Sequence, residues 1–259
     1  MGLAWGAMYG VTSNAKPIRK ISYMLPFLIN VIMIVAYFTY ASNLGYTSIP
    51  VEFHHVSTSR GLGVRQIFYS KFVAWFLAWP AVIFGLSILT DTFSSTTALF
   101  STKLGLFQNM FAKVLGTWVF VIGLLIGALI KSSYKWGYFT FAVFAQLFAM
   151  GLICYNYVDF VKNSSGSKKP FVFFVVMMHM LVWLLYPVCW GLSEGGNVIK
   201  PTSEAVFYGI LDLINFGCLP TITAYLNAQK YDEFADIVEA QTATEKIPAS
   251  PRHSGDTAA

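Results

Sequence analysis

The amino-acid sequence predicts an all-α integral membrane protein. Of its 259 residues, 56% are hydrophobic and only 11% are charged, a balance that excludes an ordinary soluble domain. The apolar residues gather in runs long enough to cross a hydrocarbon core of ~30 Å as helices. These runs contain little strict alternation of apolar and polar residues, which favours helices over an outer-membrane barrel.

Six full membrane spans are predicted, separated by short polar links. They are expected at residues 21–41, 65–89, 104–130, 137–161, 170–192 and 205–226. Residues 1–11 are also apolar, but as a helix they would reach only about half-way across a bilayer. They lack the basic start and the cleavage site of a signal peptide.

The basic residues of the links predict the orientation. Eight lie on the side of the C-terminus and five on the other side, and cytoplasmic links are the ones rich in Lys and Arg. We therefore expect a cytoplasmic C-terminus. Residues 229–259 become polar, small and net acidic, and we expect them to form a largely disordered cytoplasmic tail.

The last span carries a carboxylate, Asp212, well inside its apolar run. Such a group costs about 2.5 to 3.5 kcal/mol on insertion scales, so it should face the protein interior, hold a partner or be protonated. Phe216 stands one turn further along the same helix face.

A final helix that reads Asp, three residues, then Lys is the signature of the microbial (type 1) rhodopsins, whose lysine binds retinal as a Schiff base. The last span resembles this helix, with Phe216 in place of the lysine. Other stretches resemble the fungal opsin-related proteins, a heat-shock and stress-associated plasma-membrane branch that lacks the lysine. They are AYFTYASNLG (36–45), RQIFYSKFVAWFLAWP (65–80), SYKWGYFT (133–140) and YPVCWGLSEGGNVIKP (186–201), which runs on into FYGILDL. The resemblance covers roughly residues 20–228.

The resemblance implies a seven-transmembrane-helix, type 1 rhodopsin-like bundle over residues 1–228. Residues 1–11 would then be the inner half of an incomplete first helix, and the chain is expected to start late. In the polar loop at residues 42–64, the family forms a small hairpin. The implied orientation agrees with the cytoplasmic C-terminus that the basic residues predict.

The resemblance also implies that proton pumping is lost. A pumping opsin has arginine where Lys71 stands, a carboxylate proton acceptor at Ala74 and a proton donor at Gly85. Alanine and glycine can neither accept nor donate a proton, so pumping by the known route is not expected. Glu194 and Glu204 match positions that release protons, and we expect them to be surface carboxylates of a loop.

One polar cluster is predicted within the bundle. We expect Lys71 to pair with Asp212, with Tyr37 and Tyr186 as hydrogen-bonding neighbours, because an unpaired buried charge is expensive. The cluster would lie toward the outer side. It would either lock the helices together or line a transport path.

The positions where opsins build an aromatic box around retinal form a vestigial ligand pocket in this chain. Its members are Trp75, Ala78, Trp183, Tyr186, Pro187, Trp190 and Phe216. An aromatic stripe at helical spacing is more often packing than a ligand site. A non-covalent apolar ligand, such as a sterol, a fatty acid or a free retinoid, stays open as the alternative, while covalent retinal is not expected.

Four further residues carry side chains that could take part in chemistry. Lys113 is expected to snorkel to the membrane interface rather than to replace the Schiff-base lysine. His179 is expected to be a hydrogen-bonded packing residue, and the adjacent His54 and His55 are weak evidence for metal. No metal site and no disulfide framework is predicted.

The resemblance implies a non-photoactive, stress-associated membrane protein that protects the plasma membrane or regulates a membrane pump. It would act like a chaperone rather than an enzyme. The expected partners are the lipid bilayer and either a proton-pumping ATPase or a second copy of the chain, and nucleic acid is not suggested. The alternatives are a channel or transporter that uses Lys71 and Asp212, and, disfavoured, a retinal-binding photoreceptor or proton pump.

Overall fold

Six helices that are long and apolar enough to cross a membrane make up most of the computed structural model, which describes residues 4, 17–56, 63–90, 103–163 and 169–229. The helices are α2 (Pro17–Ala41), α3 (Tyr69–Thr90), α5 (Lys103–Ala128), α6 (Lys135–Asn163), α7 (Lys169–Trp190) and a final helix, Pro201–Gln229, which begins with α8 (Pro201–Asp212). Each of the six predicted spans is therefore present. The partial helix expected at residues 1–11 lies, apart from Ala4, outside the described residues, as does the tail beyond residue 229.

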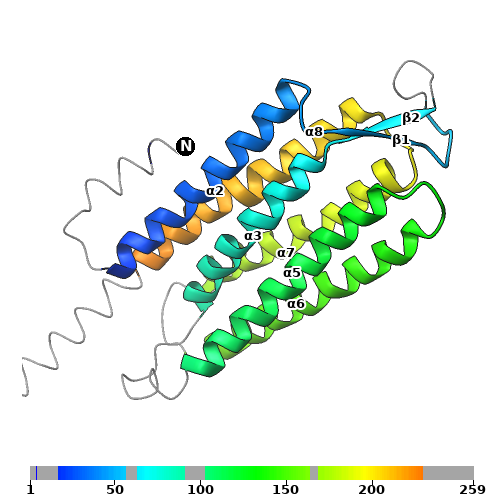
Figure 1. Ribbon diagram of the computed structural model, residues 1–259. Coiled ribbons are helices and arrows are strands. Elements are labelled where there is room, and N and C mark those ends of the chain that lie inside the picture. The colour runs from blue at the N-terminus through cyan, green and yellow to red at the C-terminus, as the bar shows by residue number, and fades with distance from the viewer. Residues whose placement is uncertain (1–3, 5–16, 57–62, 91–102, 164–168, 230–259) are drawn as a thin grey trace, which may run out of the picture.

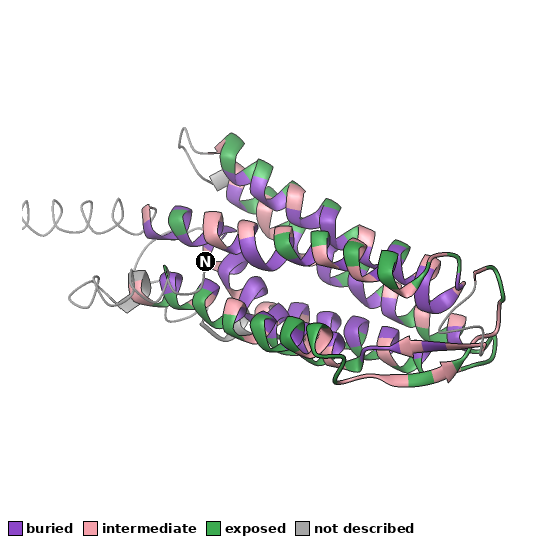
Figure 2. Ribbon diagram, turned by 90° about the horizontal axis from the view of Figure 1, so that it is seen from above, coloured by how far each residue is buried: buried purple, intermediate pink, exposed green. Residues whose placement is uncertain are grey.

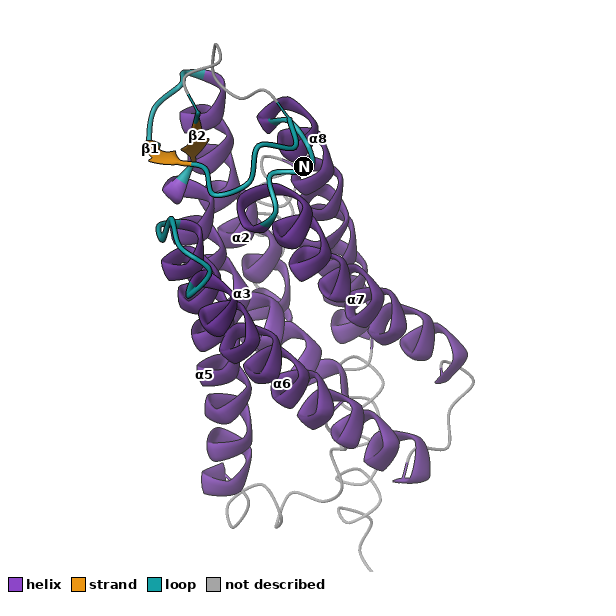
Figure 3. Ribbon diagram, turned by 90° about the vertical axis from the view of Figure 1, so that its right-hand side faces the viewer, coloured by secondary structure: helices purple, strands orange, loops and turns teal. Residues whose placement is uncertain are grey.

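Each helix packs against the next one along the chain, and the ring is closed between its ends. Contacts run from α2 to α3, α5, α6, α7 and α8 in turn, and α2 also packs against η3 (Leu213–Cys218) of the final helix. Figures 1 and 3 show the result as an elongated bundle of roughly aligned helices. A central interior is therefore reached by side chains from all six helices.

A short β-hairpin lies at one end of the bundle, where α2 ends and α3 begins (Figure 1). Strand β1 (Thr47–Pro50) pairs antiparallel with β2 (Val64–Ile67). The hairpin that the resemblance implied is thus present, and it takes over residues 65–67, which the sequence assigned to a span. The turn before β1 needs Gly45, because its φ is +66° and a Cβ there would lie 2.8 Å from Cβ of Ser70.

Small residues bring α5 and α6 close together. A Cβ on Gly116 would lie 3.0 Å from the carbonyl oxygen of Ala145, and one on Gly123 would lie 3.0 Å from Cβ of Ala142. Small residues at a helix interface let two backbones approach within a membrane, where packing rather than water exclusion drives association.

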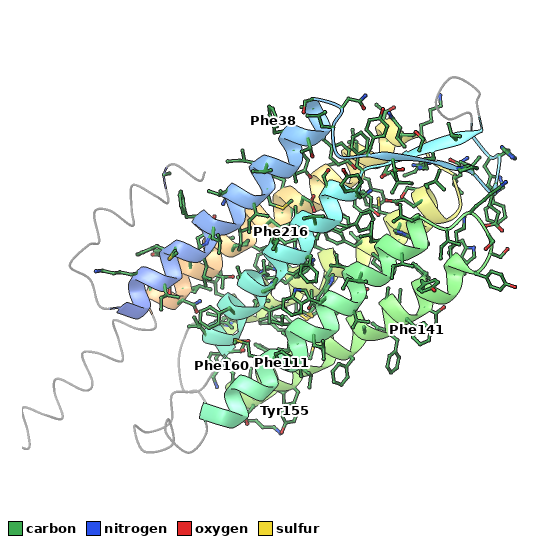
Figure 4. The ribbon with its side chains drawn as sticks, viewed as in Figure 1. Phe38, Phe111, Phe141, Tyr155, Phe160 and Phe216 are labelled. Atoms are coloured by element: carbon green, nitrogen blue, oxygen red, sulfur yellow. The ribbon has the colours of Figure 1, made fainter. Side chains whose placement is uncertain are left out.

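The outer surface of the helices is apolar and the interior is densely aromatic. Phe38, Phe141 and Tyr155 are 64%, 71% and 70% exposed and point away from the bundle, whereas Phe216 is 1% exposed at its centre (Figure 4). Figure 2 shows the same division along every helix, with buried residues on the inner faces. Apolar side chains on an outer surface suit a surrounding lipid bilayer.

Two π-helical turns interrupt the regular helices near the interior. The turn η2 (Gly191–Gly195) extends α7, and η3 holds Asn215 and Phe216 in the final helix. A π-helical turn rotates the following side chains relative to a regular α-helix and is often found at functional positions.

Candidate functional site

Asp212 is buried and accepts three hydrogen bonds from three different helices. The hydroxyls of Tyr37 on α2 and Tyr186 on α7 each donate over 2.7 Å, and the indole N–H of Trp75 on α3 donates over 3.0 Å. Tyr37 and Tyr186 are the neighbours that the sequence placed beside it, and Trp75 is an additional donor. A carboxylate with three donors needs no cation to be satisfied.

The expected pairing of Lys71 with Asp212 is corrected by the structure. The buried ammonium of Lys71 instead donates to Glu194 and Glu204, in two salt bridges whose side chains are almost wholly buried. The physical reason is proximity to charged partners: two carboxylates at the hairpin end of the bundle neutralise the cation, while neutral donors already satisfy Asp212.

Glu194 and Glu204 are also not the surface carboxylates that the sequence predicted. They are 7% and 2% exposed, because Glu194 lies in η2 and Glu204 in the first turn of α8, and both turn inward. Hydroxyl groups of Ser193 and Tyr208 donate further hydrogen bonds to Glu194. We call the set Arg65, Lys71, Glu194 and Glu204 the outer charge network, where outer denotes the end of the bundle that carries the hairpin.

Arg65 completes the outer charge network and ties the hairpin to it. Its guanidinium donates to Glu204 from Nη2 at 2.6 Å and from Nε at 3.2 Å. The same side chain donates from Nη1 to Asn197 and to the carbonyl oxygen of Ile199, at 2.7 and 2.8 Å. The network therefore contains two cations and two carboxylates, which balance in charge. From the sequence, Arg65 was predicted only to be a basic residue of a link, so this role was not predicted.

A cavity of about 20 Å³ lies beside the outer charge network, beneath the hairpin. Its polar and charged lining comes from Arg65, Glu194, Asn197, Glu52 and Lys135. Lys135 and Glu52 are 3.1 Å apart, and Ser133 donates to the same carboxylate. These contacts, first that of Ser133 and then that of Lys135, hold the pKa of Glu52 below its ordinary value.

The predicted pocket residues meet around a core of packed rings. Phe216 contacts Trp79 edge to face, with ring centroids 5.3 Å apart, and Trp79 lies 4.4 Å from Trp183 in turn. Trp75 and Tyr186 meet edge to face at 5.2 Å nearby. Trp79 was not among the predicted pocket residues, although its spacing of four from Trp75 places it on the same helix face.

Three of the predicted pocket residues, Trp190, Ala78 and Pro187, do not belong to this group of contacting rings. Trp190 points between α5 and α6, where its indole N–H donates to the carbonyl oxygen of Leu124 at 3.0 Å and its ring stacks on Phe139. Ala78 and Pro187 are buried within α3 and α7. These aromatic side chains contact one another and residues of neighbouring helices, and Figure 4 shows Phe216 in the middle of the side chains.

Lys113 and His179 are two ionisable residues that lie deeper in the bundle. Lys113 is 1% exposed and its ammonium lies 3.4 Å from the Ser87 hydroxyl, so it does not snorkel to the interface as expected. His179 is a buried hydrogen-bonded residue, with Nδ1 3.0 Å from the side-chain oxygen of Asn215. His54 and His55 are exposed beside the hairpin.

Curated relatives of this chain include fungal proteins with a heat-shock name and with an opsin-like name. The chain is 37% identical over 278 residues to the 30 kDa heat shock protein of Saccharomyces cerevisiae, an alignment that covers 99% of this chain and 81% of the relative. It is 41% identical over 209 residues to the opsin-like protein carO of Fusarium fujikuroi, covering 80% of this chain and 64% of that one. The chain thus spans less than two thirds of the length of carO.

Solved structures with the same arrangement of helices are microbial rhodopsins. The light-driven proton pump LR (Mac) of Leptosphaeria maculans superposes with a TM-score of 0.70 at 19% identity, over 88% of this chain and 90% of that one. A bromide-bound halorhodopsin of Halobacterium salinarum superposes with a TM-score of 0.71 at 16% identity, over 89% and 88%. At these identities the likeness establishes the fold alone.

The family model for bacteriorhodopsin-like proteins matches residues 1–229, which includes every described helix. With the fungal relatives and the shared fold, this match makes the chain a multi-pass, opsin-related membrane protein. It belongs to the bacteriorhodopsin-like protein family.

Proposed function

We propose that this protein is a non-photochemical opsin of the fungal plasma membrane, with a stress-associated role in protecting that membrane or regulating a pump within it. The observation that carries the proposal is the buried ring of Phe216. An imine to retinal requires a primary amine, and a phenyl ring has no group that forms one. The action would be chaperone-like rather than enzymatic.

The packing around Phe216 supports the absence of a bound polyene. Trp79 contacts both Phe216 and Trp183, and all three rings are buried, so large rings fill the centre of the bundle. Aromatic side chains that fill the interior stabilise the bundle by packing, and an extended ligand would have to displace them. We infer that the bundle does not need a cofactor for its stability.

The missing relay groups support the loss of pumping. Ala74 and Gly85 lie buried on α3 at the positions where a pump would carry carboxylates. Neither side chain binds a proton in the accessible pH range, so a proton cannot pass through them. The carboxylate of the final helix, Asp212, is held by three neutral donors.

The stress-associated role is supported by the relatives. One of them, 37% identical over almost the whole chain, carries the name of a heat shock protein. We infer a plasma-membrane location with a cytoplasmic C-terminus, where residues 229–259 would be available to a proton-pumping ATPase or to a second copy of the chain. The lipid bilayer itself is the partner of the apolar outer surface.

A retinal-binding assay tests the central claim. Purified protein in lipid nanodiscs is incubated with all-trans retinal and then with borohydride, and the absorbance spectrum and the intact mass are recorded. We expect no visible band and no added mass, while an opsin that retains the lysine gives both under the same conditions. A visible band with a reduced adduct on any lysine of this chain would overturn the proposal.

The stress-associated role needs a test in cells. We expect cells without the gene to survive a heat or acid challenge less well, and wild-type and Phe216→Leu genes to rescue them equally. Purification from native membranes with and without residues 229–259 then tests contact with the pump. Equal survival of cells with and without the gene would contradict the role.

A channel or transporter is the second candidate, and the outer charge network favours it. The cavity of about 20 Å³ lies between the hairpin and buried charges, as an outer vestibule would. Flux into proteoliposomes at varied pH distinguishes the two candidates. Proton or ion flux that is lost in Lys71→Met would favour transport, whereas leak equal to that of empty liposomes would exclude it.

A further inference from the structure

A second small cavity lies inside the half of the bundle away from the hairpin. It is lined by the early part of α2, the later part of α3, the middle of α7 and the last turns of the final helix. Its volume is about 10 Å³. Most of the lining is apolar, but the polar residues Ser22, His179, Thr223 and Asn227 also face it.

Three polar atoms of these residues have no hydrogen-bonding partner among the described residues. They are Nε2 of His179, Oγ1 of Thr223 and Oδ1 of Asn227. The three residues are 1%, 3% and 1% exposed, so bulk water does not reach them. Buried polar atoms are normally paired, with protein or with an ordered water.

The other polar atoms of His179 and Asn227 are already engaged, which decides what the unpartnered atoms can do. Nδ1 of His179 faces the carbonyl oxygen of the Asn215 side chain at 3.0 Å, so the ring proton belongs on Nδ1 and Nε2 is an acceptor. The amide nitrogen of Asn227 donates to the carbonyl oxygen of Gly85 at 2.9 Å, so its Oδ1 is an acceptor too. The hydroxyl of Thr223 can turn to donate.

We propose that this cavity is a binding site for one water molecule. A water has two hydrogens, one for Nε2 of His179 and one for Oδ1 of Asn227, and a lone pair for the hydroxyl of Thr223. The volume agrees, because a cavity of roughly 10–15 Å³ holds a single water, and buried waters typically make about three hydrogen bonds. A larger ligand does not fit.

The water joins three helices into one hydrogen-bonded unit. It links α7, through His179, to the end of the final helix, and the Asn227 side chain continues the link to α3 at Gly85. A bridging water is nearly as favourable as a direct hydrogen bond. In this half of the bundle, neutral polar groups of α3, α7 and the final helix are thereby linked to one another.

The test uses histidine labelled with ¹⁵N in the full-length protein in lipid bilayers. Solid-state NMR reports which ring nitrogen carries the proton and whether magnetisation passes from water to the nitrogen without a proton. The variant His179→Phe identifies which signal belongs to His179. We expect His179 to be protonated on Nδ1, with transfer from water to Nε2. No transfer to Nε2, or a proton on Nε2, would overturn the proposal.

A matched pair of threonine variants adds a second readout. Thr223→Val keeps the side-chain shape but removes the donor, so we expect weaker water transfer to His179 and a lower Tm. Thr221→Val is the control, because the Thr221 hydroxyl donates to the carbonyl oxygen of Gly217 at 2.7 Å within the helix. It should leave the water signal unchanged. If the cavity is dry, Thr223→Val relieves an unpaired hydroxyl, and a raised Tm with an unchanged histidine signal would refute the site.

Discussion

The ammonium of Lys71 contacts the carboxylate of Glu194, which lies 123 positions further along the chain, whereas Asp212 is held by neutral donors. Two separate polar centres therefore exist on the outer side of the bundle. The outer charge network balances its own charges, and the Asp212 centre joins α2, α3 and α7 through hydrogen bonds alone. Each centre can be perturbed without removing a partner of the other.

Lys71→Met should destabilise the protein by roughly 3–5 kcal/mol, because it leaves two buried carboxylates with Arg65 as their remaining cation. Thermal unfolding in detergent measures the loss, and Lys131→Met, at an exposed position, is the control. The double variant Lys71→Met with Glu194→Gln should cost less than the sum of its parts. Lys71→Met with Asp212→Asn should be additive, and strong coupling of that second pair would contradict the assignment.

Asp212→Leu should be far more harmful than Asp212→Asn. Leucine orphans the donors of Tyr37, Tyr186 and Trp75. Tyr186 and Trp75 are buried, and each unpaired buried donor costs about 1–3 kcal/mol, whereas Tyr37 is 38% exposed and costs less. Asparagine retains an oxygen acceptor, and a tyrosine hydroxyl can turn to accept from its amide. The Tm values of the two variants are compared. Tyr37→Phe is measured as well, because it removes one donor and leaves the carboxylate with two. Equal losses for Leu and Asn would show that charge matters more than hydrogen bonding.

Phe216→Lys alone should not create a retinal pigment. The introduced amine would have the right chemistry, but the rings of Trp79 and Trp183 occupy the neighbouring space. Phe216→Lys combined with Trp79→Ala opens that space and should give an adduct that borohydride traps. The absorbance spectrum and the intact mass are the readouts, and Trp79→Ala alone is the control. An adduct in that control would point to Lys71 or Lys113 as a reactive amine.

Gly123→Val should destabilise the contact between α5 and α6. A Cβ at Gly123 would lie 3.0 Å from Cβ of Ala142 and 3.1 Å from the carbonyl oxygen of Tyr138, and overpacking of this kind costs typically 1–3 kcal/mol. Gly151→Ala on α6 is the matched control, because its added Cβ would meet no atom within 4 Å. Its Tm should be unchanged or higher, since alanine favours the helix over glycine. A similar loss of Tm in both variants would argue against close approach as the cause.

Glu52 should contribute stability at neutral pH that is lost in acid. Its pKa in the folded protein is lowered from 4.5 by Ser133 and Lys135, so the contribution is present above the unfolded pKa and disappears as the pH falls through the folded one. The Tm of Glu52→Gln should therefore lie below that of the wild type at pH 7 and approach it in acid. A difference that does not change with pH would mean that the carboxylate charge plays no part.

The helices were largely predictable from sequence, but the partners of the charged groups were not. All six spans appear, although the first and last begin four residues earlier than expected, and at residues 65–67 backbone pairing in the hairpin replaces the predicted helical turn. Glu194 and Glu204 were expected at the surface because they flank a polar link. The rotation of their helix ends, which no local pattern reveals, turns both carboxylates inward.

The sequence by itself determined that this chain crosses a membrane as helices and that a phenyl ring stands where the related opsins have lysine. Both depend on local chemistry, because the length of an apolar run and the identity of one side chain need no tertiary information. Only the tertiary structure decided that Lys71 meets Glu194 and Glu204, that Trp79 fills the space beside Phe216, and that His179 faces a small polar cavity. These relationships depend on how packed helices are rotated and shifted against one another, which is set by contacts between residues far apart in the chain.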